Sequence, residues 1–320
     1  MKKAMVFVLI LMMLSVTILV QAEGAASMGG EIAEIPASYT APAEHPGEVV
    51  RFDYKTSAED KYAYVYLPYG YSDQQQYDIL YVMHGGGGSQ GSLFGGAGQS
   101  NDIKNAIDHL IENGEMKPMI IVTPTFYTER HSSMGVSGSW DAVREFPDEL
   151  VNDLVPAVES AYSTYAETAD GAGFEASREH RAFGGFSMGS VTTWYVFEQY
   201  LAYFHDFIPI SGDSWTIGMQ GGNGQAEETA QALAEAVERQ GNPSFFIYAI
   251  TGSQDIAEPM MTPQVAAMRQ LDAFHFTETG REDGNLTYQV KDGGTHDMPE
   301  VKMYLYNILP RLWPAEQEGE

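Results

Sequence analysis

From residue 77 onward, short apolar segments alternate with longer segments whose apolar residues recur every three or four positions. The first short segment, YDILYVM at 77–83, is an almost continuous apolar run before a row of glycines, as expected for a strand buried on both faces. In the longer segment 101–113, Ile103, Ile107 and Leu110 share one helical face. Such alternation predicts an α/β fold with a mostly parallel central sheet and helices on both of its faces.

The rest of the chain divides into elements by the same patterns. Segments 47–56 and 61–71 alternate apolar and polar residues, which predicts antiparallel strands ahead of the parallel ones. Further strands are expected at 118–125, 180–187, 204–212, 244–252 and 286–294, and helices at 101–113, 146–162, 191–201, 225–240, 263–276 and 298–312. Pro156 predicts a kink or a break in helix 146–162. Because no internal repeat is visible, residues 48–320 are predicted to form a single domain.

The first 22 residues have the pattern of a secretory signal peptide. Lys2 and Lys3 precede a long apolar run, and Val20-Gln21-Ala22 fits a signal peptidase site. An uncleaved membrane anchor is the alternative for residues 1–22, and no other segment is apolar enough to span a bilayer. Residues 23–47 are rich in Ala, Pro, Gly and Glu and predict an N-terminal tail or linker. We therefore expect a secreted protein with no stable membrane span after cleavage.

The composition narrows both the chemistry and the partners. The chain has no cysteine, which excludes disulfides, a thiol nucleophile and Cys-ligated zinc. An exported protein without disulfides suits a bacterial source. The formal net charge of −27 disfavours nucleic acids and anionic membranes as partners and favours a neutral or weakly charged substrate. Neither a metal nor a cofactor is expected.

The segment RAFGGFSMGSVTTW, residues 181–194, contains a G-x-S-x-G pattern that runs from Gly185 to Gly189. An apolar strand is predicted before Ser187 and an apolar helix after it, so this serine lies in a tight strand-to-helix turn. Such a strained turn needs small residues two positions before and two positions after the serine. The pattern predicts Ser187 as a nucleophile, which then needs a base, an acid that orients the base, and donors for an oxyanion.

The base is expected at the carboxyl end of a strand that follows Ser187, because sites in open parallel sheets lie at that edge. His296 follows strand 286–294 and precedes a helix, which makes it the expected base. His205 stands at the start of a strand, at the wrong edge. His275 falls within or at the end of helix 263–276 and is expected to be packed or partly exposed.

The acid is expected between Ser187 and His296 in the sequence. Asp255 comes directly after strand 244–252 and gives the order Ser, Asp, His that is typical of α/β-hydrolases. Asp255 would accept the Nδ1–H of the base and stabilise the imidazolium. Glu258 in the same loop and Asp213 after strand 204–212 are alternative acids. Asp297 directly follows the base and is interpreted as a loop or cap residue.

The oxyanion donors are expected to be backbone amides. The N–H of Met188, directly after the nucleophile, is one candidate, and Gly86 or Gly87 in the loop HGGGG is the other. A phosphate-binding loop is the alternative for these glycines, but no G-x-x-x-x-G-K-[ST] pattern is present. His84 is interpreted as a structural residue that fixes the loop by hydrogen bonds.

Taken together, these motifs resemble carbohydrate esterase family 1, the secreted feruloyl and acetylxylan esterases with an α/β-hydrolase fold. The resemblance runs from about Val49 to Trp313 and is carried by seven segments: LYVMHGGGGS, IIVTPTF, FPDELVNDLVPAVESAY, RAFGGFSMGS, IPISGDSW, ITGSQDIA and GGTHDM. It implies a catalytic triad of Ser187, Asp255 and His296. It further implies hydrolysis of esters on plant cell-wall polysaccharide, with feruloylated arabinoxylan or acetylated xylan as the partner.

The acyl group is expected to be feruloyl. A flat phenolic acid needs an apolar, aromatic-lined slot with a few polar anchors. By resemblance, the segment SGDSW brings Asp213 and Trp215 near the pocket, and Trp140 is a further wall candidate; core packing is the alternative for both tryptophans. An acetyl group would need a smaller pocket, and the sequence does not measure pocket size.

Other proteins of this fold are alternatives. One alternative is an S-formylglutathione hydrolase, but the predicted export argues against it. Another is a siderophore esterase, but the low content of basic residues argues against that. Mycolyltransferases share the fold and the elbow. The alternative outside enzymes is a carbohydrate-binding relative without activity, against which the presence of all three triad residues argues.

Overall fold

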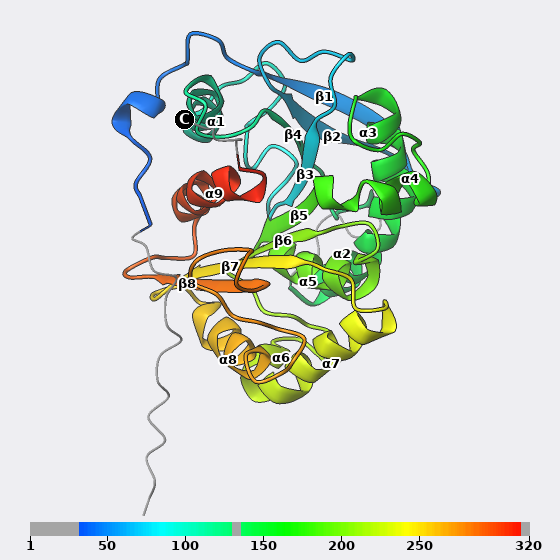
Figure 1. Cartoon of the computed structure of the whole chain (residues 1–320), viewed down its shortest axis with the longest axis vertical. Coiled ribbons are helices and arrows are strands. Elements are labelled where there is room, and N and C mark those ends of the chain that lie inside the picture. Colours follow the sequence, from blue (N-terminus) through cyan, green and yellow to red (C-terminus); the bar gives the residue numbers. More distant parts are fainter. Residues whose placement is uncertain (1–31, 130–135, 315–320) are drawn as a thin grey trace, which may run out of the picture.

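The structure is a computed structural model that describes residues 32–129 and 136–314; the predicted signal peptide lies outside these residues. In the described part, one sheet of eight strands runs through the molecule in the order β1-β2-β4-β3-β5-β6-β7-β8 (Figure 1). The strands are β1 Glu48–Lys55, β2 Asp60–Leu67, β3 Asp78–Met83, β4 Met119–Thr123, β5 Arg181–Phe186, β6 Asp206–Ile210, β7 Phe246–Gly252 and β8 Leu286–Lys291.

The sheet is antiparallel at one edge and parallel elsewhere. β1 pairs with β2 and β2 with β4 in antiparallel fashion, while the six strands from β4 to β8 are mutually parallel. β3, β4, β6 and β7 are buried at every position, whereas β1 has exposed residues among its buried ones. Helices cover both faces of the parallel strands, which is why those strands are apolar throughout. The predicted α/β fold with a mostly parallel sheet is confirmed.

Two hydrophobic cores lie on the two faces of the sheet. α1 and α9 pack on one face, and α2, α3, α5, α7 and α8 pack on the other (Figure 1). The helices are α1 Asp102–Glu112, α2 Val136–Glu149, α3 Val155–Ala161, α4 Gly171–Ala176, α5 Met188–Tyr200, α6 Gly221–Gly224, α7 Ala226–Arg239, α8 Glu258–Met268 and α9 Met298–Leu312, with short turns of other helix types at Ala37–Tyr39, Leu150–Leu154 and Arg178–His180. None of the helices in residues 32–129 and 136–314 is long and apolar enough to cross a membrane.

Two predicted helices differ from the structure. The helix expected at 146–162 begins at Val136 and is interrupted by a π-helical turn, Leu150–Leu154, directly before α3. Pro156 has no N–H to continue the α-helical ladder, and the N–H of Val155 bonds to the carbonyl of Leu150, one residue further back than in an α-helix. The helix expected at 263–276 instead runs over Glu258–Met268, because the chain near His275 forms backbone hydrogen bonds beside β8.

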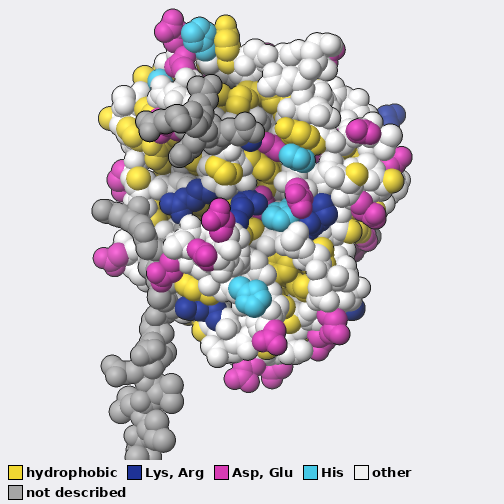
Figure 2. Space-filling model, viewed as in Figure 1, with side chains coloured by type: hydrophobic (Ala, Val, Ile, Leu, Met, Phe, Trp, Pro, Cys, Tyr) yellow, Lys and Arg dark blue, Asp and Glu magenta, His cyan; other side chains and the backbone are white. Residues whose placement is uncertain are grey.

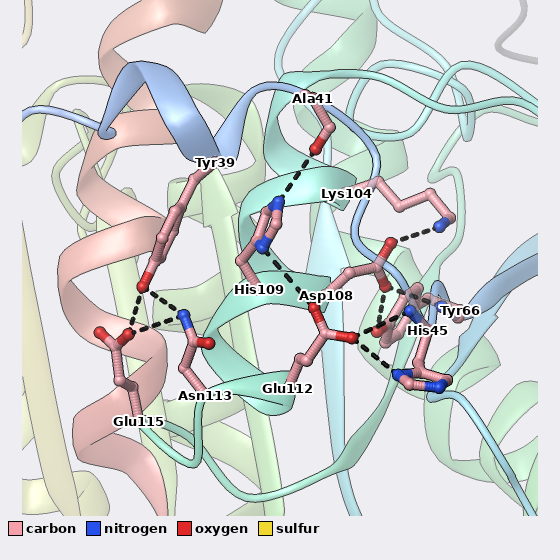
Figure 3. A network of polar contacts seen from close by, with 11 residues as sticks. Tyr39, Ala41, His45, Tyr66, Lys104, Asp108, His109, Glu112, Asn113 and Glu115 are labelled. Carbon is pink, nitrogen blue, oxygen red and sulfur yellow. Dashed lines mark hydrogen bonds and ion pairs between the residues drawn. The ribbon is translucent and has the colours of Figure 1, made fainter.

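The end of the segment predicted as a tail or linker is docked on the domain. Figure 3 shows the Tyr39 ring beside His109 of α1, with ring centroids 4.8 Å apart. The His45 backbone N–H and Nδ1 both contact the carboxylate of Glu112, at 3.0 and 2.9 Å. The Gly47 N–H donates to Asp108. Residues 39–47 therefore lie against α1 ahead of β1, while Ala33 pairs with Asn307 of α9.

The surface reflects the excess of acidic over basic residues. The chain has 44 Asp and Glu residues against 17 Lys and Arg. Figure 2 shows acidic side chains spread over one face of the molecule, with basic side chains in a row across its middle. Such a surface repels polyanions.

Candidate active site

Ser187 lies in a sharp turn between β5 and α5. Its φ of 55° and ψ of −114° are unusual for a residue with a side chain. A Cβ on Gly185 would lie 2.6 Å from the Gly189 carbonyl carbon, and a Cβ on Gly189 would lie 2.8 Å from the His84 carbonyl oxygen. Only glycine fits at both positions, so the G-x-S-x-G pattern is required by close backbone packing around the serine.

The three residues predicted as a triad come together at the carboxyl edge of the sheet. The Nε2 of His296 lies 3.0 Å from Ser187 Oγ, and its Nδ1 lies 2.7 Å from Asp255 Oδ1. The Asp255 side chain is fully buried, and that of His296 is 19% exposed. Because the carboxylate accepts at Nδ1, the neutral ring carries its proton there and leaves Nε2 free to accept the serine proton.

The loops that carry Asp255 and His296 are bound to each other. The Gln254 N–H donates to the Gly294 carbonyl at 2.9 Å. A Cβ on Gly252 would lie 2.6 Å from Gly294 Cα. The two backbones therefore pack so closely here that there is no room for a side chain at Gly252. This close backbone contact at the ends of β7 and β8 fixes the positions of the acid and the base relative to each other.

The alternative acids do not contact the base. Asp213 accepts hydrogen bonds from Trp215 Nε1 and from the Gly222 N–H, and burial raises its pKa. Glu258 begins α8 and accepts from Thr262 Oγ1, while Asp297 caps α9 by accepting from the Glu300 N–H. The other two histidines considered as bases do not contact Ser187. His205 directly precedes β6 and contacts Asp206, and His275 is exposed.

The expected oxyanion donors lie beside the elbow. Met188 is the first residue of α5, where helix amides have no acceptor within the helix. A Cβ on Gly86 would lie 3.2 Å from Met188 Cγ, so these two residues are neighbours. The N–H of Gly87, in contrast, donates to Tyr127 Oη at 2.8 Å. Since Gly87 is already engaged, Gly86 is the donor candidate that the loop leaves open.

His84 holds this loop in place by hydrogen bonds. This agrees with its interpretation as a structural residue. Its Nδ1 contacts the Gly85 carbonyl at 2.7 Å, and its Nε2 contacts Thr125 Oγ1 at 2.7 Å. A carbonyl only accepts, so Nδ1 carries the proton and Nε2 accepts from the threonine. Burial lowers the pKa of His84 to about 4, which keeps the ring neutral at pH 7. Thr125 and Tyr127, which support this arrangement, were not identified from the sequence.

Trp215 and Trp140 form one aromatic corner. Their rings meet edge to face with centroids 6.5 Å apart. Trp140 Nε1 donates to Tyr195 Oη at 2.9 Å, and that hydroxyl donates to the Trp215 carbonyl at 3.0 Å. Trp215 is only 6% exposed and Trp140 is half-buried. Asp213 anchors the Trp215 indole from within the same loop, and Trp215 packs in the buried core on this face of the sheet.

No group of three or more His, Asp or Glu side chains within the described residues could hold a metal ion.

A family model for esterases matches residues 56–312. The chain belongs to this esterase family. The structure has a TM-score of 0.78 and 37% identity to an alanine mutant of the feruloyl esterase module from Clostridium thermocellum, solved with sinapinate; the match covers 93% of this chain and 98% of that one. The α/β-hydrolase fold and the resemblance to carbohydrate esterase family 1 are thereby confirmed.

Two curated relatives are longer enzymes. The chain is 41% identical over 279 residues to endo-1,4-beta-xylanase Y of Acetivibrio thermocellus, covering 86% of this chain and 24% of the xylanase. It is 31% identical over 151 residues to an endo-1,4-beta-xylanase/feruloyl esterase of Xylanibacter ruminicola, covering 45% of this chain and 18% of that enzyme. The chain thus spans about a quarter or less of the length of these relatives.

Proposed function

We propose that this chain is a secreted serine carboxylic ester hydrolase that removes feruloyl groups from plant cell-wall xylan. The observation that carries the proposal is the pair of contacts at His296, 3.0 Å to Ser187 Oγ and 2.7 Å to Asp255 Oδ1. This arrangement suits the transfer of an acyl group to serine and then to water. The proposal rests on three side chains of this chain, those of Ser187, Asp255 and His296.

The reaction has two half-reactions. His296 Nε2 takes the proton of Ser187 Oγ as this oxygen attacks the ester carbonyl carbon. The amides of Met188 and Gly86 hold the resulting oxyanion. As the carbon–oxygen bond to the sugar breaks, His296 returns the proton to the leaving alkoxide. Water then attacks the acyl carbon and gives a proton to His296 Nε2. As the bond from this carbon to Ser187 Oγ breaks, His296 passes the proton to Oγ, which releases the acid and restores the free hydroxyl.

The choice of a feruloyl substrate is supported by two observations. A similar structure is a feruloyl esterase module bound to sinapinate, which is also a phenolic acid. The corner of Trp140 and Trp215 offers an aromatic wall to a flat ring. Xylan as the carrier is supported by the xylanase names of the curated relatives. Secretion is supported by the signal-peptide pattern of residues 1–22.

Parallel assays of the purified protein on methyl ferulate and on acetylated xylan test the proposal. Ser187→Ala is the control. Release of ferulate that disappears in the mutant is the expected result. Release of acetate alone would keep the esterase and move the substrate to acetylxylan. Release of neither acid by the wild-type protein would contradict the proposal and favour a carbohydrate-binding role.

A further inference from the structure

Tyr127 is a side chain at the site that the reaction above does not use. It follows β4 at the carboxyl edge of the sheet, and its ring stacks on His84 with centroids 5.4 Å apart. Its Oη accepts the Gly87 N–H at 2.8 Å, and its own backbone N–H donates to Thr125 Oγ1 at 3.1 Å. The ring also packs edge to face on Phe126, with centroids 4.6 Å apart, so two ring contacts and two hydrogen bonds fix Tyr127 beside the glycine loop.

The phenol group still has a proton to donate. A tyrosine hydroxyl can accept and donate at the same time, and here it accepts from an amide, which has no capacity to accept in return. Across residues 32–129 and 136–314, no acceptor is paired with the Tyr127 O–H. The side chain is half-buried and thus within reach of a ligand.

The hydroxyl lies next to the predicted oxyanion site. Gly87, which it contacts, follows Gly86, and a Cβ on Gly86 would lie 3.2 Å from Met188 Cγ. The Tyr127 hydroxyl therefore contacts the residue that directly follows Gly86, whose amide is expected to bind the oxyanion. The hydrogen bond from Gly87 also polarises the phenol and strengthens its O–H as a donor.

We infer that the Tyr127 hydroxyl is a third oxyanion donor, beside the amides of Met188 and Gly86. This inference rests on the proposed esterase function. The phenol donates a hydrogen bond to the negatively charged oxygen of each tetrahedral intermediate, and no proton is transferred. Hydrogen bonds to a charged acceptor are about twice as strong as neutral ones. Since the charge develops only in the transition state, the hydroxyl raises kcat with little effect on KM.

A pair of matched tyrosine variants tests the inference. Tyr127→Phe is expected to lower kcat by about 100-fold with KM nearly unchanged, the size of effect found for removal of one oxyanion donor. Tyr71→Phe is the control, because Tyr71 is also half-buried and its Oη also accepts a backbone N–H, from Ser163 at 2.8 Å. Tyr71 lies ahead of β3, at the opposite edge of the sheet. A kcat of Tyr127→Phe within about threefold of the wild type would overturn the inference.

A fluorinated tyrosine at position 127 separates donation from loop support. A fluorotyrosine that ionises near neutral pH keeps accepting the Gly87 N–H as a phenolate, but it no longer donates. The expected kcat falls as the pH rises through the ionisation of this phenol, relative to the same substitution at position 71. A kcat that holds while the phenol ionises would show that Tyr127 only supports the loop, and would overturn the inference.

The use of two esters separates the test of the Tyr127 hydroxyl from the test of the feruloyl substrate. Both variants are assayed on methyl ferulate and on an aryl acetate, since every acyl ester passes through the same oxyanion. Cleavage of the aryl acetate alone would contradict the feruloyl substrate, while the loss of activity in Tyr127→Phe would still support the donor role. Failure of the wild-type protein on both esters would overturn both proposals.

Discussion

Asp255 meets His296 with a single carboxylate oxygen. Oδ1 lies 2.7 Å from His296 Nδ1 and also accepts the Ala257 N–H at 2.7 Å, while Oδ2 is buried with no partner among the described residues. A buried carboxylate is costly unless it is compensated. The positive charge that develops on His296 during the reaction supplies that compensation, so this acid favours the transition state over the resting state.

Loss of the carboxylate charge at Asp255 is predicted to remove most of the activity. Asp255→Asn changes the preferred proton position on His296 and removes the stabilisation of the imidazolium. In a serine protease the corresponding change lowers kcat by about 10⁴-fold, and a loss of at least 10³-fold is expected here. Steady-state kinetics on methyl ferulate measure it. Glu258→Gln, at the start of α8, is the control and is expected to stay within threefold; an equal loss in both variants would contradict the role of Asp255.

The glycines of the elbow are predicted to be intolerant of a side chain. Gly189→Ala places a methyl group against the carbonyl oxygens of Met83 and His84. Overpacking of this kind costs about 1–3 kcal/mol of stability, and the shift of the turn is expected to reduce activity as well. Gly224→Ala is the control, because a Cβ there meets open space. Urea unfolding measures both variants, and equal stabilities of the two would contradict the packing account.

Burial of His84 predicts a loss of stability in acid. Its pKa is about 4 in the folded protein and about 6.5 in the unfolded chain. Below pH 6.5 the unfolded chain binds a proton that the folded protein does not, so stability falls as the pH drops from 6.5 towards 4. The contribution is about 3 kcal/mol over that window.

The matching variant for this pH prediction is His84→Gln. Its free energy of unfolding is expected to fall by about 3 kcal/mol less than that of the wild type between pH 7 and pH 4. Urea unfolding of both proteins at both pH values measures these changes in the free energy of unfolding. The contributions of the other titrating groups cancel when the two proteins are compared. Identical pH dependence in the two proteins would show that His84 is not held neutral.

The ion pair of Arg181 and Glu159 is predicted to contribute strongly to the stability of the fold. Arg181 begins β5, and its Nε and Nη2 donate to the Glu159 carboxylate at 2.6 and 2.7 Å with both side chains buried. Glu159→Gln leaves a buried guanidinium without its counter-charge, which costs about 3–5 kcal/mol. Asp53→Asn breaks an exposed pair and is expected to cost less than about 1 kcal/mol. Thermal unfolding separates the two; similar melting temperatures would contradict the account.

The strands and the candidate triad could be predicted because their signals are local. Strands buried on both faces are apolar runs, and the rule that parallel strands end at one edge selects Asp255 and His296 among several acids and histidines. The glycines around Ser187 mark the turn by themselves. Each strand and the turn at Ser187 are marked by neighbouring residues, and the shared edge then relates the strand ends to one another.

What could not be predicted depends on contacts between distant segments. The hydrogen bond from Gly87 to Tyr127 joins two loops that are 40 residues apart, and no local pattern marks the tyrosine. The docking of Tyr39 and His45 on α1 likewise depends on residues more than 60 positions away. The π-helical turn before Pro156 is a third case, since a proline signals an interruption but not its form.

The most direct test of the account is the mass of the enzyme caught during turnover. Wild-type protein and Ser187→Ala are mixed with methyl ferulate, quenched with acid within the first turnovers and analysed by peptide mass spectrometry. The account predicts a feruloyl adduct on the peptide that carries Ser187, and none in the mutant. A feruloyl adduct on another residue, or one that persists in Ser187→Ala, would contradict it.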